Sequence, residues 1–150
     1  MDKESRATLD DMYRCEHSPI RTQIFCIEMY DIPTFVSVHL VRHNVGVIHF
    51  VKSNRDDRCG DGSEDRYTPV NHMMVLNAQA LINMSRKRLC YKAHLKTIEV
   101  WKAVKESLRD VDADLCKYMV KECEYRNGCY EKKSCGFWND EYYSKHITWK

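Results

Sequence analysis

Residues Thr68–Arg88 read TPVNHMMVLNAQALINMSRKR, and this stretch contributes most to the predicted fold. Four of its apolar residues recur at the spacing of one helix face: Met73, Leu76, Ala80 and Met84. Thr68 is a suitable N-cap, and Pro69 is a suitable first helical residue because proline needs no intrahelical donor there. The stretch therefore predicts a long helix that begins at Thr68–Pro69 and turns one face to the core.

Two further helices are predicted towards the C-terminus. Apolar residues lie on one stripe of the first of them: Ile98, Trp101, Val104 (or Lys105) and Leu108. A shorter helix carries Val111, Leu115 and Met119, and the chain after Cys123 is predicted to be irregular. Helices therefore dominate the second half of the chain.

The first half has strand character. Residues Val47–Arg55 alternate, with His49, Val51, Ser53 and Arg55 on one face of a predicted strand. The segment after Pro33 is open: its β-branched residues favour a strand, yet Pro33 can also open a helix. A polar stretch over 56–68 is predicted to be a loop. These patterns predict one α+β domain over 1–150, with a small, mainly antiparallel sheet packed against long helices.

Length and composition favour one soluble domain. The chain has 150 residues, of which 43% are hydrophobic and 31% charged. The sequence contains no apolar run of about 18 residues, so no membrane partner is expected. The first ten residues lack the apolar core of a signal peptide, which makes a cytoplasmic location the expectation. The net charge of +2 is too small to indicate a nucleic-acid partner.

Eight cysteines invite a separate interpretation. Cys123, Cys129 and Cys135 are evenly spaced in an irregular tail that starts at about residue 120. Three thiolates and a fourth ligand, such as Cys59 or His146, would suit structural zinc. The alternative is that these cysteines are free thiols. The remaining four are interpreted as inert core thiols: Cys15, Cys26, Cys90 and Cys116.

Several polar residues are candidates for a binding site. Ser53 and Arg55 share a strand face, so their side chains can converge on one oxyanion. Asn77 and Arg88 are eleven residues apart, which places them on nearly the same face of the predicted helix, with Asn83 about a third of a turn away. The competing interpretation is that the strand residues are solvated and that the asparagines are exposed or cap a loop.

The order of these motifs resembles the flavin-dependent thymidylate synthase family. Arg42-His43 is followed by Ser53-x-Arg55 and then by Asn77-x5-Asn83-x4-Arg88. The upstream elements Pro33-x-Phe35-Val36 and His17-Ser18-Pro19 also resemble segments of that family. The similarity covers roughly residues 15–95.

The resemblance implies the fold of that family and a role for each matching residue. The implied flavin-binding residues are Ser18, Arg42, His43, Asn77 and Asn83. The implied nucleotide-binding residues are His39, Ser53, Arg55 and Arg88, of which Ser53 and Arg88 would also be catalytic. Arginine can grip phosphate or a uracil carbonyl, and amides can meet the donors and acceptors of a flavin ring.

The implied reaction is methylation of deoxyuridine monophosphate to thymidylate. FAD would be the cofactor, with NADPH as hydride source and methylenetetrahydrofolate as one-carbon donor. Members of the family build their sites between the subunits of a homotetramer, so a homo-oligomer is expected here.

Some positions differ from the family pattern and leave alternatives open. Asn44 stands where the family has arginine, no Asn-Glu pair occurs between His43 and Ser53, and the family's Ala-Gln pair is Ala93-His94. One alternative is a catalytically inactive nucleotide-binding or regulatory protein on the same fold. Another is a small zinc-stapled interaction module.

Overall fold

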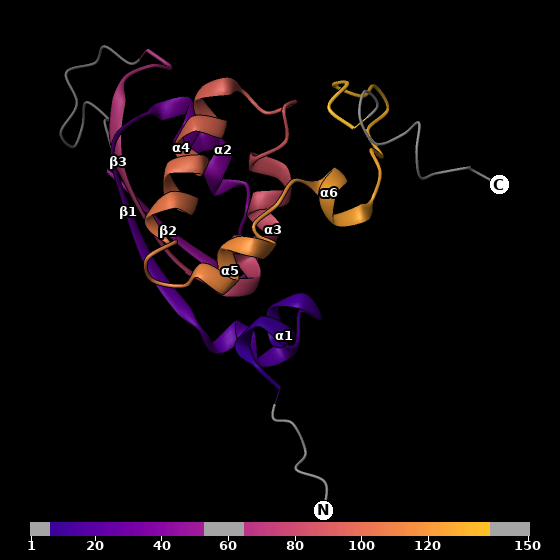
Figure 1. Cartoon of the computed structure of the whole chain (residues 1–150). Helices are drawn as coiled ribbons and strands as arrows, with labels where there is room; N and C mark the ends of the chain where they lie inside the picture. Colours follow the sequence, from indigo (N-terminus) through magenta and orange to yellow (C-terminus); the bar gives the residue numbers. More distant parts are fainter. Residues whose placement is uncertain (1–6, 53–64, 139–150) are drawn as a thin grey trace, which may run out of the picture. The chain divides into compact units, whose positions relative to one another are not determined.

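The central element of the fold is strand β3, Pro69–Asn77, in the middle of a three-stranded antiparallel sheet of order β1-β3-β2 (Figure 1). The computed structural model describes residues 7–52 and 65–138. Strand β1 spans Ile24–Pro33 and β2 spans Val47–Val51, and both pair with β3. The predicted α+β class with a small antiparallel sheet is confirmed.

The prediction of a helix starting at Thr68–Pro69 is wrong. The helix of this stretch, α3, begins only at Ala78 and ends at Arg88. Alternate residues of β3 are buried: Val70, His72, Met74 and Leu76. This period of two, sustained by pairing with two strands, prevails over the helical spacing, which corresponds to a helix only from Ala78 onwards. Met73, expected in the core, is half-buried on the other face of the sheet.

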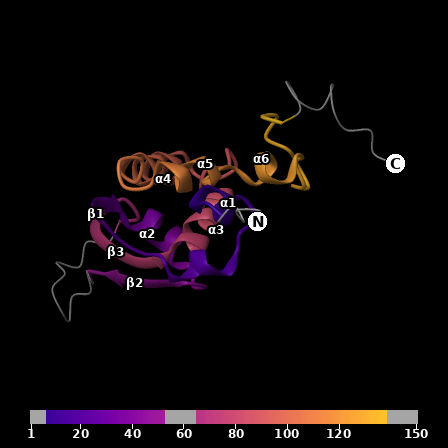
Figure 2. The same cartoon turned by 60° about the horizontal axis from the view of Figure 1, so that its bottom comes forward.

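The segment after Pro33 is a helix. Helix α2 spans Thr34–Val41, with Pro33 as its N-cap residue, and it contacts β1 and β3 (Figure 2). Val36 and Leu40 are fully buried. The predicted strand at Val47 is confirmed as β2, where Ile48 and Phe50 are exposed and Val47 and His49 are half-buried. Ser53 and Arg55 lie outside the described residues.

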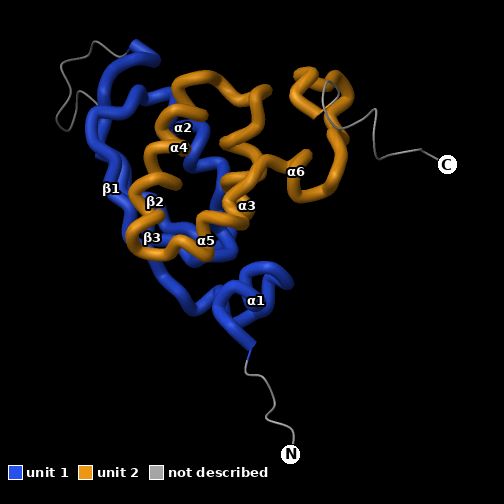
Figure 3. Tube along the Cα trace, viewed as in Figure 1, with its two compact units in different colours: residues 1–81 blue, residues 82–150 orange. Residues whose placement is uncertain are grey.

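The chain forms two compact units, residues 1–81 and residues 82–150 (Figure 3). The first unit also contains helix α1, Leu9–Arg14, and the short 3-10 helix η1, Ser18–Thr22. The second holds α4, Leu95–Ser107, α5, Ala113–Tyr118, and α6, Glu122–Arg126. Among the described residues, no helix has the length and hydrophobicity needed to cross a membrane.

The second unit has the predicted apolar stripe. Ile98, Trp101, Val104 and Leu108 are all buried, which confirms the helix predicted there, whereas Lys105 is half-buried. The prediction of the next helix is right for Leu115, whereas Met119 is buried but is the C-cap residue after α5, and Val111 is exposed and precedes α5. Two of the expected core cysteines, Cys15 and Cys26, are exposed as well, because α1 and the outer face of β1 leave them uncovered.

A hydrogen bond in this core yields a stability prediction. The indole N–H of Trp101 donates to the Ser85 hydroxyl at 2.9 Å, and both residues are fully buried. Ser85→Ala would leave a buried donor without this acceptor, so we expect the free energy of unfolding to fall by about 1–2 kcal/mol. Urea denaturation measures the change. The exposed Ser107→Ala is the control, and equal effects of the two variants would contradict the prediction.

Candidate functional site

Asn77 marks the junction between β3 and α3. Its side-chain Oδ1 accepts from the backbone N–H of Ala80 at 2.9 Å, which is the geometry of a helix N-cap. Asn77 is therefore the residue before the helix, and the prediction that it shares a helix face with Arg88 is wrong. The cap uses one of the two lone pairs of Oδ1, so Asn77 can meet a further ligand through its Nδ2 donors or through the second Oδ1 lone pair.

The loop after α2 reaches this junction. The backbone N–H of Asn77 donates to the carbonyl of Gly46 at 3.1 Å. Gly46 has φ +74, and a Cβ atom added to it would lie 2.8 Å from Asn77 Nδ2. Both the backbone conformation and the space therefore require glycine at this position. The close approach places the loop that carries Arg42 and His43 beside Asn77.

A third segment ends at the same junction. The backbone N–H of Ala78 donates to the carbonyl of Gln23, directly after η1, at 3.1 Å. Gln79 donates to the carboxylate of Glu16 at 2.6 Å, just before η1. The structure thus brings the segment of Ser18, the loop of Arg42 and His43, and Asn77 together in the first unit. Ser18 and Arg42 are both exposed.

A pair of histidines supports this loop. The Nε2 of His49 lies 2.6 Å from the carbonyl oxygen of His43, and its Nδ1 lies 2.9 Å from Nε2 of His72. A carbonyl only accepts, so His49 carries a proton on Nε2; when His49 is neutral, its Nδ1 accepts and His72 donates from Nε2. His72 Nδ1 is then a bare acceptor, buried with no partner among the described residues. Burial, together with the nearby His49, lowers the pKa of His72 to about 4.

This histidine pair was not predicted as a unit. The sequence pattern predicts the correct strand for His49 but a helix for His72, so it indicates no face common to both. The period of two in β3 was the signal that could have found it.

The remaining predicted residues are dispersed. His39 lies half-buried on α2, edge-on to the Phe35 ring at 5.6 Å between centroids. Asn83 is exposed on α3 and accepts from Arg86 at 3.1 Å. Arg88 is half-buried in the last turn of α3, within the second unit. Ser53 and Arg55 belong to the part of the chain that the structure does not describe.

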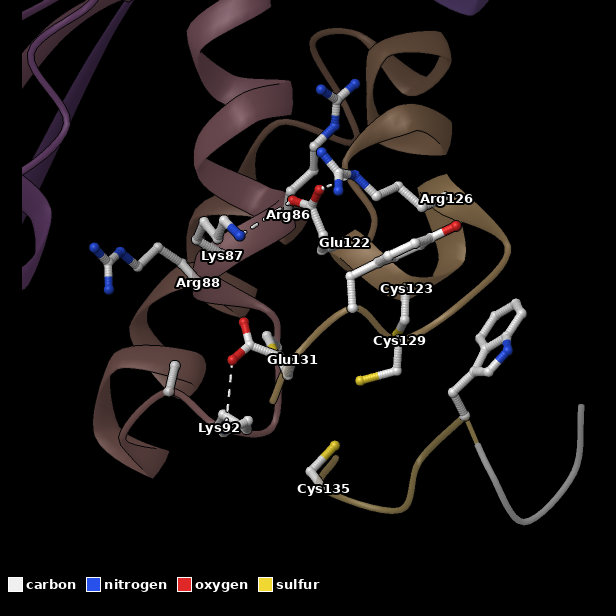
Figure 4. A pocket seen from close by; sticks show the side chains of 14 residues that line it. Arg86, Lys87, Arg88, Lys92, Glu122, Cys123, Arg126, Cys129, Glu131 and Cys135 are labelled. Carbon is white, nitrogen blue, oxygen red and sulfur yellow. Dashed lines mark hydrogen bonds and ion pairs between the residues drawn. The ribbon is translucent and has the colours of Figure 1, made fainter. Parts of the chain in front are cut away.

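The second unit contains a pocket of about 390 Å³ (Figure 4). Four cysteines line it: Cys90, Cys123, Cys129 and Cys135. Three of them are those predicted as metal ligands, whereas Cys90 was predicted to be an inert core thiol. The turn that follows α3 places Cys90 at the pocket, and no local sequence pattern predicts this turn. The suggested fourth ligands Cys59 and His146 are outside the described residues.

Charged side chains surround these thiols. Glu122 accepts from Arg126 at 2.6 Å and lies 3.6 Å from Lys87, while Lys92 pairs with Glu131 at 3.2 Å. Burial, reinforced by the charge of Glu124, raises the pKa of the Cys123 thiol. Within residues 7–52 and 65–138, no three His, Cys, Asp or Glu side chains already stand where they could hold a metal ion together.

Comparison with models of known protein families found no match, and no curated protein matches the chain either.

Proposed function

We propose that this chain is a flavin-dependent enzyme that methylates deoxyuridine monophosphate, or carries out a related one-carbon modification of it. The observation that supports the proposal is the convergence at the β3–α3 junction. Three segments that the resemblance assigns to the flavin, and that are distant in sequence, meet there through backbone hydrogen bonds involving Gly46, Asn77 and Ala78.

The residues at the junction fit a flavin nucleotide. Arg42 is exposed at the C-cap of α2 and can bind phosphate oxygens through paired N–H donors. Ser18 supplies an exposed hydroxyl, and Asn77 supplies the Nδ2 donor for a ring carbonyl. When bound, the flavin would supply hydride transfer to the carbon unit on the pyrimidine.

The chain's own residues would bind and orient the flavin and the nucleotide. Arg42, Ser18 and Asn77 would hold the cofactor, and the resemblance assigns nucleotide binding to Arg88, Ser53 and Arg55. A guanidinium can stabilise negative charge that develops on a uracil ring. The proposal includes the homotetramer that the resemblance implies.

Flavin titration tests the proposal. We expect the purified protein to bind FAD, with a visible absorption spectrum that shifts when deoxyuridine monophosphate is added, and to form thymidylate with NADPH and methylenetetrahydrofolate. Asn77→Asp keeps a good N-cap but replaces the Nδ2 donor, so we expect the Kd for FAD to rise roughly tenfold or more, with little loss of stability. Arg42→Ala is expected to weaken FAD binding similarly.

Lys102→Ala, an exposed change on α4, is the control and is expected to leave FAD binding unchanged. A protein that binds no FAD at high concentration would overturn the proposal. If such a protein were stabilised by deoxyuridine monophosphate, the result would favour the alternative of an inactive nucleotide-binding protein.

A further inference from the structure

We propose that Cys90, Cys123, Cys129 and Cys135 bind one structural Zn²⁺ ion, with Cys90 as the ligand that completes a four-thiolate site. The four side chains come from the turn after α3, from α6 and from the loop beyond it, and they line one pocket of the second unit (Figure 4). Four cysteine ligands in tetrahedral geometry form a common type of structural zinc site.

The low apolar burial of the C-terminal tail supports a stabilising role for a bound metal. Within residues 120–138, only Gly128 and Trp138 are buried. A segment with so little apolar burial has no core of its own, and small elements of this kind are held by disulfides or by a metal. Zinc would connect Cys123, Cys129 and Cys135 of the tail to Cys90 at the end of α3.

The charge around the pocket suits this ligand set. A Zn²⁺ ion with four thiolates carries a net charge of about −2. Five cationic side chains line the same pocket, against two anionic ones. The cations are Arg86, Lys87, Arg88, Lys92 and Arg126, and the anions are Glu122 and Glu131. This excess of positive charge would offset the negative charge of the zinc–thiolate complex.

Metal binding requires the sulfur atoms to converge further. The thiols lie around the pocket but do not yet share a coordination sphere, and zinc–sulfur bonds are about 2.3 Å long. Cys129 and Cys135 lie in irregular chain after α6, outside any helix or strand, so zinc binding would require movement of this loop and rotation of the side chains. Each thiol would lose its proton on binding, so the affinity for zinc rises with pH.

Metal analysis of the reduced, full-length protein tests this assignment. We expect one Zn²⁺ per chain, and we expect Co²⁺ in its place to give the thiolate-to-metal charge-transfer and strong visible bands of a tetrahedral sulfur site. Zinc should also protect four cysteines from alkylation, and mass spectrometry should identify them as those of the pocket. Cys15 and Cys26, which are exposed in the first unit, should be modified whether or not zinc is present.

Single serine variants identify the ligands. Cys90→Ser and Cys123→Ser are each expected to lower zinc affinity at least tenfold, whereas the controls Cys15→Ser and Cys26→Ser should retain it. A Co²⁺ spectrum without thiolate bands, or disulfides among these cysteines with no metal uptake after reduction, would overturn the site. Protection of Cys59 instead of Cys90 would overturn the assignment of Cys90. These readouts need no flavin, so they stand or fall independently of the proposed enzymatic function.

Discussion

Gly46→Val is expected to lower the free energy of unfolding by about 2–4 kcal/mol and to abolish FAD binding. Gly46 has φ +74, where a β-branched residue is strained. Its new Cβ would also lie 2.8 Å from Asn77 Nδ2, so the loop or the amide must move. Since Asn77 caps α3, that movement would weaken the start of the helix as well as the proposed flavin contact. Urea denaturation and FAD titration measure the two effects.

Gly136→Ala is a suitable control. Gly136 also has a positive φ, of 89°, but belongs to the second unit. The Gly136→Ala substitution should therefore lower the free energy of unfolding through backbone strain while leaving FAD binding intact. If Gly46→Val bound FAD as tightly as the unmodified protein, the junction would not be the flavin site. If its stability were also unchanged, the close approach of Gly46 to Asn77 would be contradicted.

Acidification is expected to cost about 3 kcal/mol of stability through His72 alone. Its folded-state pKa is lowered from 6.5 to about 4, because the ring is buried and lies beside His49. The unfolded chain therefore takes up the proton first as the pH falls. The stabilising contribution is complete above pH 6.5 and is lost as the pH falls from there through about 4. The bare Nδ1 explains the cost, because a proton there would have no acceptor among the described residues.

Urea denaturation between about pH 7.5 and about pH 4.5 should show this loss. His72→Gln removes the titrating ring, so we expect a less stable protein whose stability falls less steeply with acid. His17→Gln, an exposed control, should keep the full pH dependence. An NMR titration that found the His72 ring protonating near its ordinary pKa would contradict the prediction.

Local sequence patterns were sufficient to predict some of the helices and strands. The stripe of Ile98, Trp101 and Leu108 predicted α4 because one helix face packs on one core. Val47 and His49 alternate with Ile48 and Phe50, which predicted β2. Pro33 was compatible with either a strand or a helix after it. The pairing of β1 with β3 ends at Pro33, and the following residues form α2.

The β3–α3 stretch shows where local patterns fail. Leu76, Ala80 and Met84 have helical spacing, yet Leu76 belongs to the strand, and the helix starts at Ala78. Sheet pairing on both sides of β3 stabilises the extended form through hydrogen bonds with residues at least 20 positions away, as with Val51 and His72. Propensity within the stretch cannot report such partners.

The sequence by itself determined the α+β class and the position of α4, because periodicity and composition are local properties. The tail predicted to be irregular from about residue 120 instead contains helix α6, Glu122–Arg126. Only the tertiary structure decided that Asn77 caps α3 beside Gly46, that His49 meets His72, and that Cys90 shares a pocket with the cysteines of the tail. Each of these contacts joins residues far apart in the chain. They depend on chain reversals and strand register, and those follow from the packing of the whole chain.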